Sequence, residues 1–216
     1  MTDLGVLITF EGIDGSGKTT QARLFHQHLR ARKVNCALYR EPGGTPFGES
    51  VRRLLLNEGG REGKGQDFGP MAETMLFLAA RAELMRQIVL PLLTKGSVVI
   101  LDRFTDSTLA YQGYGRGLDV ELLKRMNDAV TGGRSPDLTI LVDLDPETAL
   151  ARHRRSHDRM ELEGLEFMRR VREGYLAIAE AESERVMVLD GSRKETEIAA
   201  DVNERVNKVK RISPLS

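Results

Sequence analysis

Cysteine is almost absent from this chain, and its scarcity excludes a fold held together by disulfides. The one cysteine among 216 residues, Cys36, has no partner for an internal disulfide. It lies in an apolar stretch at 34–39, where we expect it to act as a small buried hydrophobic residue. A lone thiol fits a reducing compartment, and the first residues lack the basic start and apolar run of a secretion signal. We therefore expect a cytoplasmic protein.

The chain also lacks an excess of either charge and lacks long apolar runs. Lysine plus arginine and aspartate plus glutamate both number 32, so the formal net charge is zero. No overall field then favours DNA, RNA or an anionic membrane surface, and anion binding has to come from locally placed arginines. The longer apolar stretches, such as 88–93 with its Pro91, are too short to cross a bilayer. We expect neither a nucleic acid nor a membrane as partner.

What the chain does have is a complete phosphate-binding pattern. Residues 12–19 read Gly-Ile-Asp-Gly-Ser-Gly-Lys-Thr, between an apolar stretch at 6–10 and a helix-compatible run. Backbone N–H groups and the helix N-terminus converge on phosphates in such a loop, while Lys18 reaches the outer phosphates and Thr19 ligates Mg²⁺. A chance match has odds of about 1%, and the flanks weaken the alternative of a plain glycine-rich turn. The residues predicted to bind a nucleoside triphosphate are Gly12, Ile13, Asp14, Gly15, Ser16, Gly17, Lys18, Thr19 and Thr20.

Short β-branched segments alternate with longer helical patterns along the chain. Predicted strands lie at 6–10, 34–40, 97–101, 138–143 and 186–190. Predicted helices lie at about 18–32, 47–57, 71–94, 105–131, 146–156, 162–182 and 194–211. Apolar strands separated by helices indicate an α/β, three-layer fold with a five-stranded parallel sheet covered on both faces. No linker or repeat divides residues 1–216, so we expect a single domain with its ligands at the carboxyl ends of the strands.

A second cluster suited to nucleotides follows the third predicted strand. This strand ends in Asp102, and an acid at that place can hold Mg²⁺ directly or through water. Arg103 comes next, where a forked guanidinium can bind a second phosphate through two hydrogen bonds. The alternative is a structural salt bridge at the strand end. The choice between them decides whether the chain has one phosphate site or two in line.

Two helical segments carry side chains suited to a base and a sugar. Ser107 and Tyr111 are four residues apart, as are Thr108 and Gln112, so each pair shares one side of a helix. A solvated helix with one half-buried tyrosine would show the same spacing.

Phe77 stands four residues before Arg81, and a ring and a guanidinium on adjacent turns can stack on a planar base and bond its carbonyl. The apolar residues at 71, 75, 78, 82 and 85 also recur at helical spacing, which is typical of core or a subunit interface.

Arginines supply the remaining candidates. The turn at 40–45, with its Pro-Gly-Gly, either orients Glu41 or simply joins two elements, and Arg52 lies in the helix beyond it. The only dense group of arginines lies at 152–159. Such a group is ordinary on a solvated helix, but an arginine delivered by a mobile segment can also stabilise charge on a migrating phosphoryl group.

Together these segments resemble the thymidylate kinase family over nearly the whole chain. The resemblance is carried by residues 10–20, 40–45, 77 with 81, 102–104, 111–113 and 115–117. It implies a parallel five-stranded core, a lid at about 150–162, ATP with Mg²⁺, dTMP as phosphoryl acceptor, and a homodimer. The stretch 14–16 contains no arginine, which matches the bacterial branch, in which the lid supplies the catalytic arginine.

The resemblance also implies roles for individual residues. Lys18 and Thr19 would serve ATP and Mg²⁺, and Asp14 would approach the 3′-hydroxyl of the acceptor. The predicted substrate-binding residues are Asp14, Glu41, Arg52, Phe77, Arg81, Arg103, Thr108, Tyr111 and Gln112. The predicted catalytic residues are Lys18, Arg103, Asp14 and Arg155, with Arg154 and Arg159 as alternatives to Arg155. The predicted metal ligands are Thr19 and Asp102.

The predicted chemistry needs no general base, because the attacking oxygen belongs to a phosphate monoester whose second pKa is about 6. The competing enzyme interpretation is a kinase of the same fold that acts on another acceptor. A GTPase switch is disfavoured because the nearest string to a guanine-reading motif, at 207–210, lacks the acid. A transport ATPase is disfavoured because no loop rich in Ser-Gly-Gly is present.

Overall fold

The structure is a computed structural model that describes residues 5–56, 68–152 and 164–207. Its centre is a five-stranded sheet with the order β2-β3-β1-β4-β5, in which every neighbouring pair is parallel. The strands are β1 (Val6–Glu11), β2 (Cys36–Arg40), β3 (Val98–Asp102), β4 (Leu138–Asp143) and β5 (Val186–Asp190). The predicted fold class is confirmed, and each predicted strand lies within two residues of the observed one.

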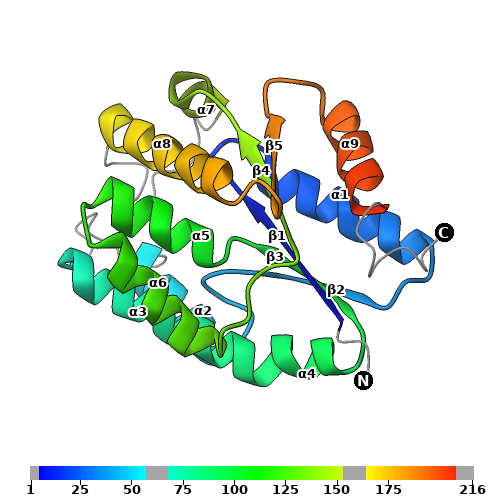
Figure 1. The fold of residues 1–216 in the computed structure, drawn as a ribbon, viewed down its shortest axis with the longest axis horizontal. Helices are drawn as coiled ribbons and strands as arrows, with labels where there is room; N and C mark the ends of the chain where they lie inside the picture. Colours follow the sequence, from blue (N-terminus) through cyan, green and yellow to red (C-terminus); the bar gives the residue numbers. More distant parts are fainter. Residues whose placement is uncertain (1–4, 57–67, 153–163, 208–216) are drawn as a thin grey trace.

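Helices cover both faces of this sheet, as Figure 1 shows. Alternate residues of β1 point to opposite faces, so Val6, Ile8 and Phe10 pack against α1 (Lys18–Ala31) and α9 (Glu195–Asn207). On the other face, Leu7 belongs to a core that continues into the helices after β2. Burial on both faces explains why these strands are continuously apolar rather than alternating.

The second face is covered by the remaining helices, only some of which carry candidate substrate side chains. They are α2 (Pro46–Leu56), α3 (Pro70–Leu84), α4 (Leu90–Thr94), α5 (Thr105–Thr108), α6 (Val120–Thr131), α7 (Pro146–Arg152) and α8 (Leu165–Ala181). Within this described part of the chain, no helix has the length and apolar character needed to cross a membrane.

Two of the predicted helices are interrupted. The predicted helix 71–94 divides into α3, a wide π-helical turn η1 (Met85–Val89) and α4, and η1 lies just before Pro91, whose ring does not fit a regular α-helix. The predicted helix 105–131 divides into α5, a second π-helical segment η2 (Leu109–Gly115) and α6. Gly117 takes a φ of 78°, and the Asp119 side chain then accepts hydrogen bonds from two N–H groups at the start of α6.

The expectation that Cys36 is buried needs correction, whereas the apolar series at 71–85 fits the expected alternatives of core and subunit interface. Cys36 is only partly buried, although it does pack against the core, because β2 is an edge strand. The apolar series at 71–85 is divided, since Leu78 of α3 and Met85 of η1 are buried while Met71 and Met75 of α3 are exposed. The inner half of that series is therefore core, and the outer half is free to meet another surface.

Candidate active site

The loop between β1 and α1 forms a compact cradle at the carboxyl edge of the sheet. Gly12 has a φ of 139°, and a Cβ there would lie 2.4 Å from the carbonyl oxygen of Val142. Gly15 has a φ of 81°, and its Cβ would lie 2.6 Å from the carbonyl oxygen of Ala149. Any side chain at these two positions would push β4 or α7 away. Glycine is therefore what allows the backbone of this loop to wrap closely around an anion.

Lys18 is the cation at the inner end of this cradle. Its ammonium group donates to the Ile13 carbonyl oxygen at 3.3 Å and to Asp14 Oδ1 at 3.2 Å, and the residue is 6% exposed. A phosphate chain in the cradle would find this charge already oriented by two acceptors.

Thr19 and Asp102 lie side by side beneath the cradle. The Thr19 hydroxyl donates to Asp102 Oδ2 at 2.6 Å, while Asp102 Oδ1 is buried without a hydrogen-bond partner. The described residues hold no group of three or more histidine, cysteine or acidic side chains that could bind a metal. Mg²⁺ is usually held by one or two protein oxygens together with phosphates and water. The hydroxyl and the orphaned carboxylate oxygen therefore fit Mg²⁺ that arrives with a nucleotide.

Arg103 forms a second cationic centre immediately after β3. It is one of two described non-glycine residues with positive φ, at 73°, a conformation that costs about 1–3 kcal/mol and clusters at functional sites. Its Nη2 donates to Asp14 Oδ1 at 2.6 Å and to the Tyr111 hydroxyl at 3.0 Å. Its Nη1 lies within 3.2 Å of three acceptors, namely the Gly12 carbonyl oxygen and the hydroxyls of Ser107 and Tyr175.

Asp14 joins the two cationic centres, because the same Oδ1 accepts from Lys18 and from Arg103. Burial would raise the pKa of Asp14, but the charges of Arg103 and Lys18 hold that pKa well below its usual range. Burial also raises the pKa of Tyr111, whose hydroxyl donates to Asp14 Oδ2 at 3.1 Å. Asp14 is thus a permanent anion that keeps two cations a few ångströms apart.

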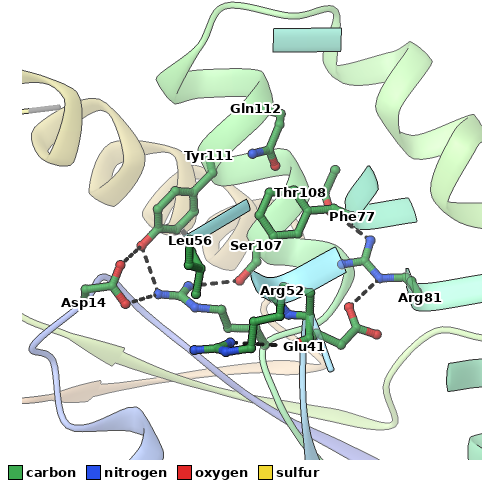
Figure 2. Close-up of a pocket in the computed structure, with 12 residues that line it drawn as sticks. Asp14, Glu41, Arg52, Leu56, Phe77, Arg81, Ser107, Thr108, Tyr111 and Gln112 are labelled. Carbon is green, nitrogen blue, oxygen red and sulfur yellow. Dashed lines mark hydrogen bonds and ion pairs between the residues drawn. The ribbon is translucent and has the colours of Figure 1, made fainter. Parts of the chain in front are cut away.

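A pocket lies in front of Arg103, with about 590 Å³ of empty space that includes its opening to solvent. Figure 2 shows side chains from the phosphate loop, from α2 and α3 and from the segment after β3 converging on it. All the residues predicted to bind substrate line it, together with Pro42, Leu56 and Ser107. The structure thus brings these side chains together, and their binding roles stay predictions.

The far end of the pocket is built around the buried guanidinium of Arg81, which is 2% exposed. Its Nε donates to Glu41 Oε2 at 2.7 Å, and its Nη1 donates to Thr108 Oγ1 at 2.8 Å and Asn127 Oδ1 at 2.6 Å. Its Nη2 donates to the Phe104 carbonyl oxygen at 2.9 Å. A guanidinium has five N–H donors. One Nη2–H is therefore left for a ligand.

A buried carboxylate behind Arg103 was missed by the sequence interpretation. Glu11, the last residue of β1, accepts from the Phe104 N–H at 2.7 Å, the Ser107 hydroxyl at 2.6 Å and the Tyr175 hydroxyl at 3.0 Å. The hydroxyls of Ser107 and Tyr175 also accept hydrogen bonds from Arg103. Glu11 therefore helps to hold the strained turn at Arg103 in place. Burial, and secondarily the charge of Asp106, raises the pKa of Glu11 to about 7.

We predict that Glu11 makes folding stability fall as the pH rises. Because the pKa of Glu11 increases on folding from 4.5 to about 7, its contribution is full below pH 4.5 and is lost as the pH rises through 7. Since a pKa unit corresponds to about 1.4 kcal/mol, the whole change is on the order of 3 kcal/mol. Urea unfolding from pH 4.5 to 8 should show the free energy of unfolding of wild type falling relative to Glu11→Gln. Glu180→Gln, exposed on α8, is the control, and parallel curves for wild type and Glu11→Gln would refute the assignment.

The lid expected at about 150–162 is described only as far as Arg152, whose Nη1 donates to the Gly191 carbonyl oxygen at 3.0 Å. Arg154, Arg155 and Arg159 lie outside the described residues.

The chain is similar to known proteins over most of its length. A family model described as thymidylate kinase matches residues 10–202. A thymidylate kinase from Synechococcus sp. (strain JA-2-3B'a(2-13)) is 47% identical over 195 residues, which cover 90% of this chain and 91% of the relative. One from Kosmotoga olearia is 43% identical over 189 residues, covering 87% and 88%. The crystal structure of thymidylate kinase from Ehrlichia chaffeensis superposes with a TM-score of 0.75 at 37% identity, over 94% of this chain and 98% of that one.

Proposed function

The chain belongs to the thymidylate kinase family and phosphorylates dTMP to dTDP, and we propose that it does so by direct in-line transfer from Mg-ATP. The observation that carries the mechanism is the sharing of Asp14 Oδ1 between Lys18 and Arg103. One cation faces the phosphate cradle and the other faces the 590 Å³ pocket. Two phosphates held by them would meet across Asp14 without a protein nucleophile between them.

The obstacle to this reaction is bringing two anions together. The acceptor phosphate is largely ionised at neutral pH, since its second pKa is about 6, so no side chain has to remove a proton. Lys18 and Arg103 offset the repulsion and hold the geometry. Arg52, whose Nη1 donates to the Pro42 carbonyl oxygen at 3.3 Å, would add a further cation on the acceptor phosphate.

The rest of the pocket would bind the base and the sugar of the nucleotide. Phe77 would stack on thymine, and the remaining N–H of Arg81 would reach its carbonyl oxygen, with Thr108 and Gln112 near the other polar edge. Asp14 would approach the 3′-hydroxyl, and Tyr111, held by Arg103 and Asp14, would crowd the 2′ position and favour deoxyribose. Glu41, whose pKa is raised by burial, would act indirectly by orienting Arg81.

Mg²⁺ would be held by the Thr19 hydroxyl and by Asp102, directly or through water. It supplies charge neutralisation on the transferring phosphoryl group. We further propose that Arg155, in a lid at about 150–162 that belongs to the same domain, provides the catalytic arginine.

We also propose a homodimer. Leu54 of α2 and Met71 and Met75 of α3 are exposed, on two helices that share a small core of Val51 and Ala80. Exposed apolar side chains on adjacent helices are typical of subunit interfaces. Sedimentation equilibrium should give twice the chain mass of 24.1 kDa, and a single chain mass at micromolar concentration would contradict the dimer.

An acceptor panel tests the proposed function. We expect rapid ADP release from Mg-ATP with dTMP, slower release with dUMP, and very little with dCMP, UMP, AMP, GMP or no acceptor. Omitting Mg²⁺ should abolish the dTMP reaction. Equal ADP release with and without dTMP would show a hydrolase, and equal rates with AMP or GMP would show a kinase for another acceptor.

A further inference from the structure

Glu73 is a buried acidic residue on α3. It belongs neither to the phosphate cradle nor to the residues that line the pocket. It is 1% exposed. It accepts from Arg116 Nε at 3.1 Å and Nη2 at 3.0 Å, and from Gln112 Nε2 at 3.0 Å. Arg116 lies just after η2 and Gln112 lies within it. The acid therefore ties α3 to the segment that carries one wall of the pocket.

The contact with Glu73 fixes which way the Gln112 amide faces. A carboxylate paired with arginine only accepts hydrogen bonds, so Gln112 has to turn its NH₂ group toward Glu73. Its Oε1 is then directed away from Glu73, and Gln112 lines the pocket. Figure 2 shows this amide oxygen turned toward Phe77 and Thr108. No donor from the described residues bonds this Oε1. Nor is Oε1 one of the side-chain atoms that are completely buried without a hydrogen-bond partner.

The same end of the pocket carries one free donor. Four of the five N–H groups of Arg81 are taken by Glu41, Thr108, Asn127 and the Phe104 carbonyl. The pocket therefore presents one N–H from Arg81 and one C=O from Gln112 to whatever base enters. Thymine and uracil offer a carbonyl at C4 beside a ring N3–H, which complements this pair. Cytosine offers an amino group beside an unprotonated N3, which meets donor with donor and acceptor with acceptor.

We propose that Glu73 is a positioning residue that sets base selectivity. By holding the Gln112 amide in one orientation, it makes the pocket accept an N3–H pyrimidine and reject cytosine. The inference rests on the proposed placement of the base between Phe77 and Arg81. A buried site built to hydrogen-bond its substrate can lower kcat/KM for a mismatched analogue by about 10⁴- to 10⁵-fold, which is enough to exclude dCMP.

A purely structural role for Glu73 would have a different consequence. If the acid served only to hold α3 against Arg116, its loss would lower stability and reduce activity on every acceptor in proportion. If it orients Gln112, its loss would change the ratio of kcat/KM for dTMP over dCMP. This ratio is therefore the quantity to measure.

Glu73→Gln is the sharpest variant, because a glutamine at 73 can donate to Gln112 Oε1 and allow the Gln112 amide to turn over. We expect kcat/KM for dTMP to fall. We also expect the ratio of kcat/KM for dTMP over dCMP to decrease at least tenfold relative to wild type. Glu83→Gln is the matched control. Glu83 is also on α3 and also accepts from an arginine and a glutamine, Arg86 and Gln87, but it lies outside the pocket. Glu83→Gln should leave the ratio unchanged.

Glu73→Asp serves as the second variant if Glu73→Gln does not fold, as judged by thermal unfolding. It keeps the negative charge beside Arg116 but is one methylene shorter, so its carboxylate no longer reaches the Gln112 amide. The ratio of kcat/KM for dTMP over dCMP should therefore decrease as well. An unchanged ratio in a folded Glu73 variant would overturn the inference. A wild-type enzyme that does not prefer dTMP over dCMP would instead overturn the proposed base pocket, so the two failures are distinguishable.

Discussion

Arg103→Ala should lower kcat/KM for dTMP by about 10³-fold, because a buried charged donor to a transferring or accepting phosphate contributes on this scale. The loss should appear mainly with dTMP as the varied substrate. The glycine loop would lose the Arg103 contacts with Gly12 and Asp14, but Lys18 keeps its own contacts with the Ile13 carbonyl and Asp14, so binding of a fluorescent ATP analogue should change little. Asp14 would still accept from Lys18 and from the Tyr111 hydroxyl, so the variant should remain folded.

Two controls separate the role of Arg103 from general effects of substitution. Arg86→Ala removes an arginine at an exposed site on η1, where its partner is Glu83, and should leave kinetics unchanged. His26→Ala should also be close to wild type, since the proposed chemistry uses no histidine. Arg103→Lys keeps the charge but loses the planar fork, and should lie between alanine and wild type. Wild-type kinetics for Arg103→Ala would remove the second phosphate site, and with it the in-line mechanism.

The fold could be predicted because its signals are local. The phosphate-binding motif requires a strand before it and a helix after it, and strands buried on both faces appear in the sequence as short apolar runs. The interruptions could not be predicted in the same way. The pattern at 105–131 keeps a helical period across Gly117 and Asp119, and only the left-handed glycine followed by an N-capping acid marks the break. The widening at η2 has no comparable signal in the sequence.

The same contrast between local and non-local signals applies to the residues of the candidate site. Asp14, Lys18 and Arg103 follow from motifs at strand ends. Glu11 stands beside the phosphate loop, yet an acid closing an apolar strand looks solvent-facing until its partners are known. Tyr175 is one of those partners, and it comes from an amphipathic helix 164 residues away, where nothing local distinguishes it from a core residue.

Asn127 and Glu73 show the same limit. Asn127 lies on α6, and its contact with Arg81 spans 46 residues. Glu73 lies on α3 and reaches Gln112 across 39 residues. Both are polar residues in helices that look ordinary by themselves. Residues proposed to touch the ligand can be inferred from motif chemistry, whereas residues that orient them depend on tertiary packing, which one sequence does not display.

Lys18→Ala should have the complementary effect to Arg103→Ala. We expect kcat to fall by about 10³-fold or more, because the phosphoryl group in transfer loses its inner cation. The acceptor site should survive, since Asp14 keeps its contacts with Arg103 and Tyr111. Calorimetric binding of dTMP should therefore stay within a few-fold of wild type, while turnover with saturating ATP and Mg²⁺ is nearly lost.

Lys18→Arg tests whether charge alone is sufficient. The ammonium occupies a site that is 6% exposed, between the Ile13 carbonyl and Asp14, and a guanidinium is too large for it. We expect Lys18→Arg to be nearly as inactive as alanine in a coupled assay for ADP. Substantial turnover by Lys18→Arg would show that a diffuse positive field suffices. Loss of dTMP binding in Lys18→Ala would show that the two cations form one site, contrary to the proposed separation of donor and acceptor phosphates on either side of Asp14.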